Sequence, residues 1–445
     1  MRNERICKLG LIHLQRYHTR HGVSSGKRSI ILWGIVFASL IIRIGFAVFL
    51  SPYIDPHDSM SVDASSYHQI AQNLVERHIF TSSLDPPYNP QLPGTFRPPL
   101  TPFYLAAIYS ILGVNVLWGR IGLTIISSLS CGLTYMLGEK LCGRTTGIIA
   151  GVISCVYPFF LLLVHLPLTE GLSIFLTLAL ITLLYSYPSY IKDHPGNGHI
   201  VPELAWTGGV GMLFGLSLLN KAVNIVVFPC IVLWGLFLIP APLRKRLVKL
   251  FVVGVVAGIV ILPWTIRNYR IVGAVIPVNS NGGLAFYLGN NPFTEKNLAA
   301  LEQGTSSGWT PPKDVFAQFA DISFADAKAY EKRAIRLGFE FIRENPEKFR
   351  NFAFRKLRIF WSPYPHILDE VTWYPVALLS IIGVWHSFSC WKKYLLVYVL
   401  IGSSTIIPMV FTSMPRFRAP LLPFLIIFAS FALVTLTRWW YANRH

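Results

Sequence analysis

An aspartate and an arginine, Asp63 and Arg97, mark the stretch of this sequence that is best suited to chemistry. A carboxylate can accept a proton as a general base, and a guanidinium group can bind phosphate through paired hydrogen bonds. Two short helices are expected here, over residues 63–79 and 98–112, so that one begins at the acid and the other follows the arginine. We interpret the pair as part of a reaction site at a membrane surface.

The spacing of apolar residues supports both helices. After Asp63, apolar or small residues recur at helical spacing, with polar residues filling much of the remaining circumference: Tyr67, Ile70, Ala71 and Leu74. The second segment, Pro98–Leu112, is apolar but shorter than the roughly 20 residues that cross a bilayer. Both helices are therefore expected to lie at the membrane interface.

The composition of the chain indicates a polytopic helical membrane protein. Hydrophobic residues make up 53% of 445 residues and charged residues only 13%, with a mean hydropathy of +0.50. The net charge of +18 raises the possibility of a nucleic-acid partner. However, lysines and arginines lie mainly at the ends of apolar runs, so membrane topology and anionic lipids explain them, and no nucleic acid is expected.

The apolar runs predict an all-α bundle of about ten transmembrane helices. Along the sequence, the chain divides into four regions. These are a cytoplasmic basic arm (1–28), a catalytic transmembrane module (29–264), an extracytoplasmic segment (265–372) and C-terminal transmembrane helices (373–445). The expected spans are Ser29–Leu50, Val116–Leu137, Thr146–Val164, Leu168–Tyr187, Leu204–Leu219, Ala222–Ile239, Val248–Trp264, Trp373–Phe388, Tyr394–Phe411 and Ala419–Thr437.

Positive charge sets the expected orientation in the plasma membrane. The basic arm should remain cytoplasmic, and so should the cluster Arg244–Lys249. Both conditions hold only if Pro98–Leu112 does not cross the bilayer. Both termini are then cytoplasmic, and Asp63 lies on the outer face. Arg43 falls within the first span and should face protein or water.

Further ionisable residues are expected at the same outer boundary. Glu170 begins the fourth span, and basic residues stand at other outer span ends: Arg97, Arg267, Arg416, Arg418 and Lys221. Excess positive charge is not needed on this side for topology. Phosphate binding would explain it, whereas snorkelling to lipid headgroups is the simpler alternative.

Several motifs in this order resemble the GT-C glycosyltransferases, in particular the branch of the protein O-mannosyltransferases and the lipid A aminoarabinose transferase. The motifs are Asp63–x3–Tyr67–x3–Ala71, RPPLTPFYLA at Arg97–Ala106, PWTIRNY at Pro263–Tyr269, and PRFRAPLLPF at Pro415–Phe424. The resemblance spans most of the chain from Ser29 onward.

The resemblance implies roles for individual residues. Asp63 corresponds to the catalytic base, Glu170 to a second acidic position, and Arg97 to the basic residue before the paired prolines. A second acid often follows the first directly in the family, but Ala64 occupies that position here. The residues expected to bind lipid phosphate or sugar are Arg97, Arg267, Arg416, Arg418, Lys221 and Tyr67.

Simpler interpretations remain open for some of these residues. Asp63 could be a helix N-cap, a role in which Asn serves about as well as Asp. Tyr67 fits interface packing better than catalysis. The carboxylates of Asp55, Asp58 and Asp63 could hold a divalent ion, but the arginines already offer phosphate its counter-charge. We therefore expect neither a metal nor a cofactor.

The sequence thus predicts a membrane glycosyltransferase with an extracytoplasmic active site. It would move a sugar from a polyprenyl-phosphate donor to a hydroxyl of a protein, lipid or polysaccharide acceptor, with inversion and with Asp63 as base. A secondary transporter or lipid flippase is the alternative, although such proteins tend to show internal repeats and polar residues at mid-membrane. A non-catalytic scaffold would have no use for the expected acids and arginines.

Overall fold

The computed structural model describes residues 25–50, 61–193, 200–239, 241–304, 309, 317–323 and 326–443. Throughout these ranges the chain forms helices, turns and loops, and no β-strand. The prediction of an all-α membrane protein is confirmed. The basic arm before residue 25, together with Asp55 and Asp58, lies outside the described residues.

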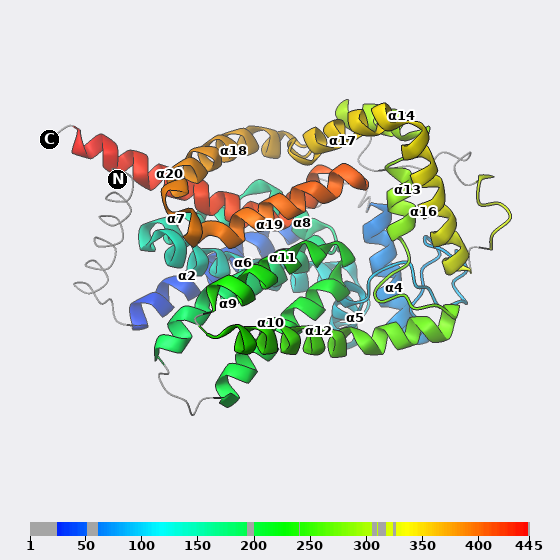
Figure 1. Cartoon of the computed structure of the whole chain (residues 1–445), viewed down its shortest axis with the longest axis horizontal. Helices are drawn as coiled ribbons and strands as arrows, with labels where there is room; N and C mark the ends of the chain where they lie inside the picture. Colours follow the sequence, from blue (N-terminus) through cyan, green and yellow to red (C-terminus); the bar gives the residue numbers. More distant parts are fainter. Residues whose placement is uncertain are drawn as a thin grey trace.

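Most helices run along the long axis of the molecule (Figure 1). In chain order this bundle contains α2 (Ser25–Gly45), η1 (Phe46–Leu50), α6 (Val116–Cys142), α7 (Arg144–Val156), α8 (Pro158–His165), α9 (Glu170–Asp193), α10 (Ile200–Asn220), η2 (Ala222–Val227), α11 (Phe228–Leu233), η3 (Trp234–Leu238), α12 (Leu243–Val272), α18 (Ile367–Ser387), η4 (Phe388–Cys390), α19 (Trp391–Val410), η5 (Pro415–Leu421) and α20 (Leu422–Ala442).

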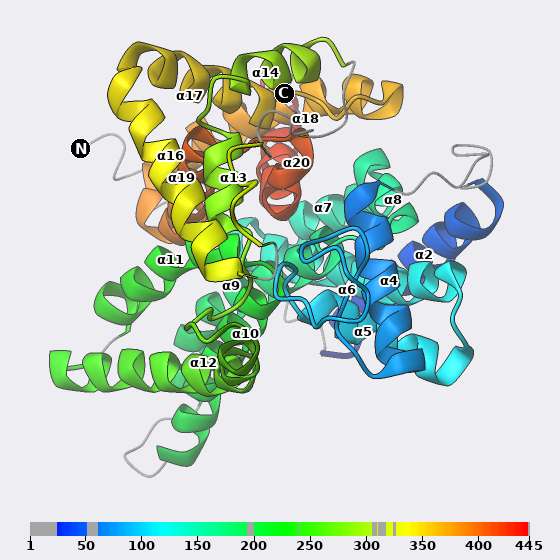
Figure 2. The same cartoon turned by 90° about the vertical axis from the view of Figure 1, so that its right-hand side faces the viewer.

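The remaining helices gather at one end of the bundle. They are α4 (Val62–Arg77), α5 (Leu100–Leu112), α13 (Gly282–Leu288), α14 (Thr294–Glu302), α16 (Ala327–Glu344) and α17 (Pro346–Phe360). Among them, α4, α13 and α16 stand across the long axis in Figure 1. Figure 2 looks onto this end and shows α4 on one side of it and α13 with α16 on the other.

The expected number of about ten spans is not confirmed. By length and hydropathy, six helical runs in the described residues can cross a membrane, or seven if one bent pair counts as a span. That pair is α7 and α8, which meet at an angle of 49°. Pro158 causes the break because it lacks an N–H and cannot continue the hydrogen bonding of α7. One of the six runs, Ile367–Val410, contains both α18 and α19, and the chain reverses direction between them in Figure 1.

Helix α12 extends past Trp264, the residue at which the sequence predicted that this span would end. Its 30 residues correspond to about 45 Å at 1.5 Å per residue, longer than a hydrocarbon core of about 30 Å. The extension is held by Trp264, whose Nε1 donates to Val278 O at 2.6 Å, and by Asn268, whose Nδ2 donates to Ile276 O at 3.0 Å. The last turns of α12 thus support the loops at the end of the bundle.

An apolar cluster fastens α4 to the bundle. Ala64, Tyr67 and Ala71 of α4 pack with residues of α5 and α6: Leu105, Ala106, Tyr109 and Leu123. Helix α5 packs closely on α6 at Gly122, since a Cβ at this position would clash with Ile108 Cδ1, and Tyr104 Oη donates to Gly122 O at 2.6 Å. This packing fixes the first turn of α4, which carries Asp63.

Candidate active site

Asp63 is not the N-cap of its helix. Ser61 caps α4, and its side-chain oxygen accepts a hydrogen bond from the Ala64 N–H at 3.3 Å. Asp63 lies in the first turn, where a negative charge is favoured by the helix dipole. Its carboxylate is therefore available for contacts outside α4.

Both oxygens of that carboxylate contact arginines from distant parts of the chain. Oδ1 accepts from Arg97 Nη1 at 2.7 Å, and Oδ2 forms an ion pair with Nη2 of Arg416 in η5. The Asp63 side chain is still 32% exposed, so a small group can reach it. Burial raises the pKa of Asp63, but the two guanidinium groups outweigh it and hold the pKa well below its usual range.

A third carboxylate, Asp85, completes the surroundings of Arg97. Its Oδ1 lies 2.9 Å from Arg97 Nε and 2.8 Å from Nη2, and its Oδ2 accepts from the Ser66 hydroxyl. The guanidinium carbon of Arg97 lies 5.3 Å from the ring centre of Tyr67 and 5.3 Å from that of Phe96. Asp85 was not among the predicted site residues, because no local signal in its proline-rich turn indicates that the turn folds back onto α4.

Glu170 and Lys221 extend the cluster toward the bundle. Glu170 begins α9 and its side chain is 3% exposed, with Oε1 at 3.2 Å from Lys221 Nζ and 3.8 Å from Arg416 Nε. Lys221 lies between α10 and η2, and its Nζ is 4.6 Å from the ring centre of Phe417. Arg416 therefore joins Asp63 to Glu170.

Arg267 has a different set of partners. Its Nη1 donates to Gly94 O at 2.6 Å, and its guanidinium carbon lies 4.4 Å from the ring centre of Trp264 and 5.1 Å from that of Phe80. No ion pair of Arg267 is found among the described residues. It anchors the loop that leads to Arg97, and so supports the site from beside it.

Arg418 is fully buried behind the cluster. Its Nη2 is 2.9 Å from Asp369 Oδ2, its Nη1 donates to Ser362 O, and its guanidinium carbon lies 4.0 Å from the ring centre of Trp373. These contacts use its charge and most of its hydrogen-bonding capacity. The geometry therefore gives no support to the expectation that Arg418 binds the lipid phosphate.

The result is a chain of alternating charges built from six side chains. In spatial order these are Asp85, Arg97, Asp63, Arg416, Glu170 and Lys221. The carboxylates are occupied by cations, and in the described part of the chain no three His, Cys, Asp or Glu residues gather to hold a metal. Such a cluster can admit an anion such as a phosphate if a carboxylate gives up its arginines.

Comparison with solved structures identifies the fold. The archaeal oligosaccharyltransferase AglB from Archaeoglobus fulgidus, in complex with an inhibitory peptide and a dolichol-phosphate, superimposes with a TM-score of 0.59 at 12% identity, covering 95% of this chain and 52% of that chain. The apo form of the Archaeoglobus fulgidus enzyme gives 0.58 at 11% identity, covering 93% and 51%. The present chain thus spans about half the length of these relatives. It is a multi-pass membrane protein with a GT-C fold.

A family model then narrows the resemblance. Residues 96–266 match the family described as dolichyl-phosphate-mannose-protein mannosyltransferase, a region that includes Arg97, Glu170 and Lys221. The predicted resemblance to the O-mannosyltransferase branch of the GT-C superfamily is thereby confirmed. ArnT from Cupriavidus metallidurans bound to undecaprenyl phosphate aligns over 91% of this chain and 78% of its own at 12% identity. Its TM-score of 0.42 is too low to support a shared fold. No curated protein matches the sequence.

Proposed function

We propose that this protein is a glycosyltransferase that moves a sugar from a polyprenyl-phosphate donor to an acceptor hydroxyl. The observation that carries the proposal is the pairing of the Asp63 carboxylate with Arg97 and Arg416. Arginine binds phosphate in the same bidentate manner as it binds carboxylate. The cluster therefore combines a proton acceptor with the groups needed to hold a phosphate leaving group.

The reaction that fits these groups is a single displacement. The acceptor oxygen attacks the anomeric carbon, the bond from that carbon to the phosphate oxygen breaks, and its electron pair leaves with the lipid phosphate. The acceptor proton passes to Asp63, and the anomeric configuration inverts. Arg97 and Arg416 stabilise the negative charge that grows on the phosphate, and each donor contributes about 3 kcal/mol.

The depressed pKa of Asp63 requires an additional step. A carboxylate held by two guanidinium groups is a weak base, and efficient bases have pKa values near the working pH. If the donor phosphate draws Arg97 and Arg416 toward itself, the groups that lower the pKa of Asp63 are partly withdrawn. Donor binding would then activate the base. Asp85 and Glu170 would keep the two arginines in place during this exchange.

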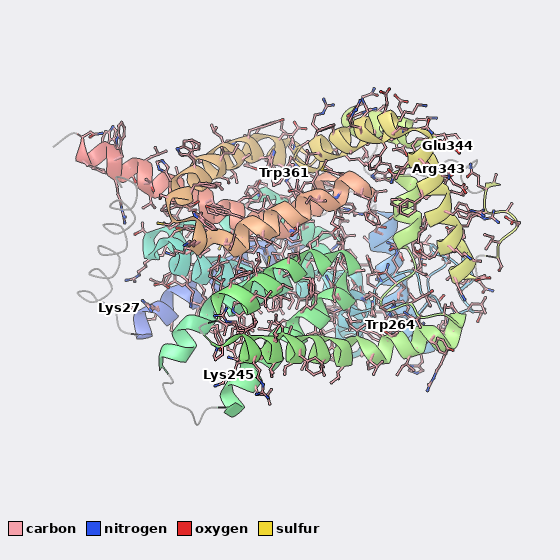
Figure 3. The ribbon with its side chains drawn as sticks, in the orientation of Figure 1. Lys27, Lys245, Trp264, Arg343, Glu344 and Trp361 are labelled. Atoms are coloured by element: carbon pink, nitrogen blue, oxygen red, sulfur yellow. The ribbon has the colours of Figure 1, made fainter. Side chains whose placement is uncertain are left out.

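The distribution of charge supports an extracytoplasmic site in the plasma membrane. Figure 3 shows Lys27 and Lys245 at one end of the molecule, and Trp264, Arg343 and Glu344 at the other. Helix α2 begins and α20 ends at the end with Lys27, whereas α4 lies at the opposite end (Figure 1). With basic residues inside, both termini face the cytoplasm and the Asp63 cluster faces outward.

The fold relatives support the choice of donor and acceptor class. The oligosaccharyltransferase with the same fold was captured with a dolichol-phosphate and a peptide. By analogy we assign a polyprenyl-phosphate sugar as donor here, with a protein, lipid or polysaccharide as acceptor and no cofactor. The surrounding apolar bundle would give the lipid tail its place among membrane lipids.

Transfer from a radiolabelled polyprenyl-phosphate sugar tests this proposal. The purified protein in liposomes with a membrane-extract acceptor should release polyprenyl phosphate and label the acceptor in equal amounts. A transporter or flippase would instead move the intact donor between leaflets without cleaving it. Movement without cleavage, or neither movement nor cleavage with donors bearing hexose and pentose sugars, would contradict the proposal.

A further inference from the structure

Asn220 is a fully buried residue at the end of α10, directly before Lys221 of the charged cluster. Its Nδ2 donates to Thr169 O at 2.9 Å and to Ser173 Oγ at 2.8 Å, and its Oδ1 accepts from Thr101 Oγ1 at 2.7 Å. The carbonyl oxygen of Thr169 can only accept a hydrogen bond, so the NH₂ group of Asn220 must face it. Both amide hydrogens and the amide oxygen of Asn220 therefore have partners.

These partners lie on two other segments that carry members of the charged cluster. Thr101 is in the first turn of α5, four positions after Arg97, and Thr169 directly precedes Glu170 at the start of α9. The Asn220 side chain thus joins the segment of Arg97 to the segment of Glu170. Because Asn220 is fully buried, it offers no surface on which a donor or an acceptor could bind.

A second buried asparagine, Asn224, fixes the backbone on the other side of Lys221. Its Nδ2 donates to Ser217 O at 2.9 Å and to Ser173 Oγ at 3.4 Å, and its backbone N–H donates to Lys221 O at 2.9 Å. Ser173 lies in the first turn of α9, three positions after Glu170. The two asparagines therefore hold the backbone of Lys221 against the turn that carries its ion-pair partner, Glu170.

We propose that Asn220 is a positioning residue for sugar transfer, because it sets the spacing between Arg97 and the pair of Glu170 and Lys221. The inference rests on the proposed transferase function, in which Glu170 helps to hold Arg416 beside the donor phosphate.

The size of the two possible effects separates positioning from a purely structural role. A hydrogen bond between helices inside a membrane protein adds little to folding stability. In contrast, a displacement of about 1 Å at a reaction site can lower the rate by about 100-fold. The network around Asn220 should therefore matter more to turnover than to folding.

Removal of the Thr101 hydroxyl tests the proposal. Thr101→Val breaks the bond to Asn220 and keeps a branched side chain of similar shape, whereas Thr101→Ser keeps the hydroxyl. In the radiolabelled transfer assay, kcat per folded molecule should fall at least about tenfold in Thr101→Val and return to within about threefold of the wild type in Thr101→Ser. KM for the donor should change less than about twofold, because Arg97 and Arg416 keep their contacts with Asp63.

Thr124→Val is the matched control. Thr124 is also fully buried, but its hydroxyl donates to Arg120 O at 2.9 Å within its own helix, α6. The variant loses a buried hydroxyl without disconnecting two helices, so its kcat should stay within about twofold of the wild type.

A double-mutant cycle shows whether Thr101 and Asn220 act through the same bond. Asn220→Ala removes the partner of the Thr101 hydroxyl, so adding Thr101→Val should slow this variant no further. Losses that multiply in the double variant would overturn the proposal. Where Asn220→Ala does not fold, the comparison of Thr101→Val with Thr101→Ser decides.

Three further results would contradict the inference. These are a wild-type kcat in Thr101→Val, a loss that Thr101→Ser does not reverse, and a lower Tm with an unchanged kcat per folded molecule. Each of them presupposes transfer by the wild-type protein and leaves the proposed function intact. Absence of transfer by the wild type would instead overturn the proposed function and this inference with it.

Discussion

Asp63 and Arg416 form an ion pair although 353 positions separate them in the chain. The first stands at the start of α4 and the second in η5, directly before the last span. Their contact joins an early and a late segment of the chain at one end of the bundle. Arg97 binds the other oxygen of the same carboxylate, so the charged cluster depends on three separate segments.

Replacing Arg97 with lysine should strongly impair sugar transfer. It contacts Asp63 and Asp85 at the same time, and a lysine ammonium cannot span two carboxylates and a phosphate as a planar guanidinium can. We expect Arg97→Lys to lower kcat/KM by about 100-fold, corresponding to roughly 3 kcal/mol of transition-state stabilisation. Initial rates over a range of donor concentrations provide the measurement.

Arg77→Lys is the matched control for that experiment. Arg77 is an exposed arginine at the end of α4 that donates to Gln91 Oε1 at 3.0 Å. Its substitution should leave kcat/KM within about twofold, because exposed polar contacts contribute little. Activity within about twofold of the wild type in both variants would show that Arg97 matters only as a positive charge, and similar large losses in both would show that the effect is not specific to Arg97.

Glu170→Gln should reduce turnover more than stability. The glutamate balances Lys221 and Arg416, and an amide can still accept a hydrogen bond from Lys221 while no longer neutralising the two cations. We expect kcat to fall at least about tenfold, with a Tm shift of a few degrees. Glu203→Gln provides the comparison, since Glu203 pairs with Lys249 at 3.0 Å away from the cluster. Equal losses of turnover and stability in Glu170→Gln would favour a purely structural role.

Arg418 should behave differently from Arg416, two residues earlier. Removing Arg418 leaves Asp369 buried without its counter-ion, which typically costs about 3–5 kcal/mol of folding free energy. Arg418→Ala should therefore lower Tm strongly, while Arg416→Ala should chiefly lower donor binding. If Arg418→Ala keeps the wild-type Tm and loses donor affinity in a lipid-phosphate binding assay, Arg418 is a phosphate ligand after all.

Lys356 on α17 should make stability depend on pH. Its side chain is fully buried among oxygens, with Nζ at 3.1 Å from Gly289 O and 3.4 Å from Val410 O, and burial lowers the pKa of Lys356 to about 7. In the unfolded chain a lysine has a pKa near 10.4. Between these two values the unfolded state binds more protons, so the free energy of unfolding should rise with pH, by up to about 4 kcal/mol.

Tm measured from pH 6.5 to 9.5 tests this dependence. Lys356→Met should flatten the profile whatever its effect on absolute stability, because the titrating group is gone. Lys348→Met, which removes an exposed lysine of the same helix, should keep the wild-type slope. A Lys356→Met profile as steep as that of the wild type would contradict the account.

The sequence predicted the helices of the site better than the spans of the bundle. Helical spacing and the short apolar run located α4 and α5 because both signals are local. The expected span Thr146–Val164 contains Pro158, and a hydropathy run gives no angle at which such a proline bends the chain. The run Ala222–Ile239 likewise became η2, α11 and η3, since short apolar stretches do not fix the helix type.

The sequence did not indicate which of the arginines pairs with Asp63. Arg267, Arg416 and Arg418 look alike as arginines at outer span ends, yet only Arg416 faces Asp63. Arg416 and Arg418 lie two positions apart on a 3-10 helix of three residues per turn, so their side chains leave it in different directions. Asp85 was overlooked because nothing in its proline-rich turn shows that the loop folds back onto Ser66.

Transfer by Asp63→Asn is the most direct test of the central claim, because asparagine keeps the shape of the side chain but cannot act as a general base. Ser61 remains to cap α4, so the variant should fold, with a Tm within a few degrees of the wild type. The account predicts that folded Asp63→Asn binds the polyprenyl-phosphate donor and transfers no sugar. Transfer at the wild-type rate by this variant would remove Asp63 from the mechanism.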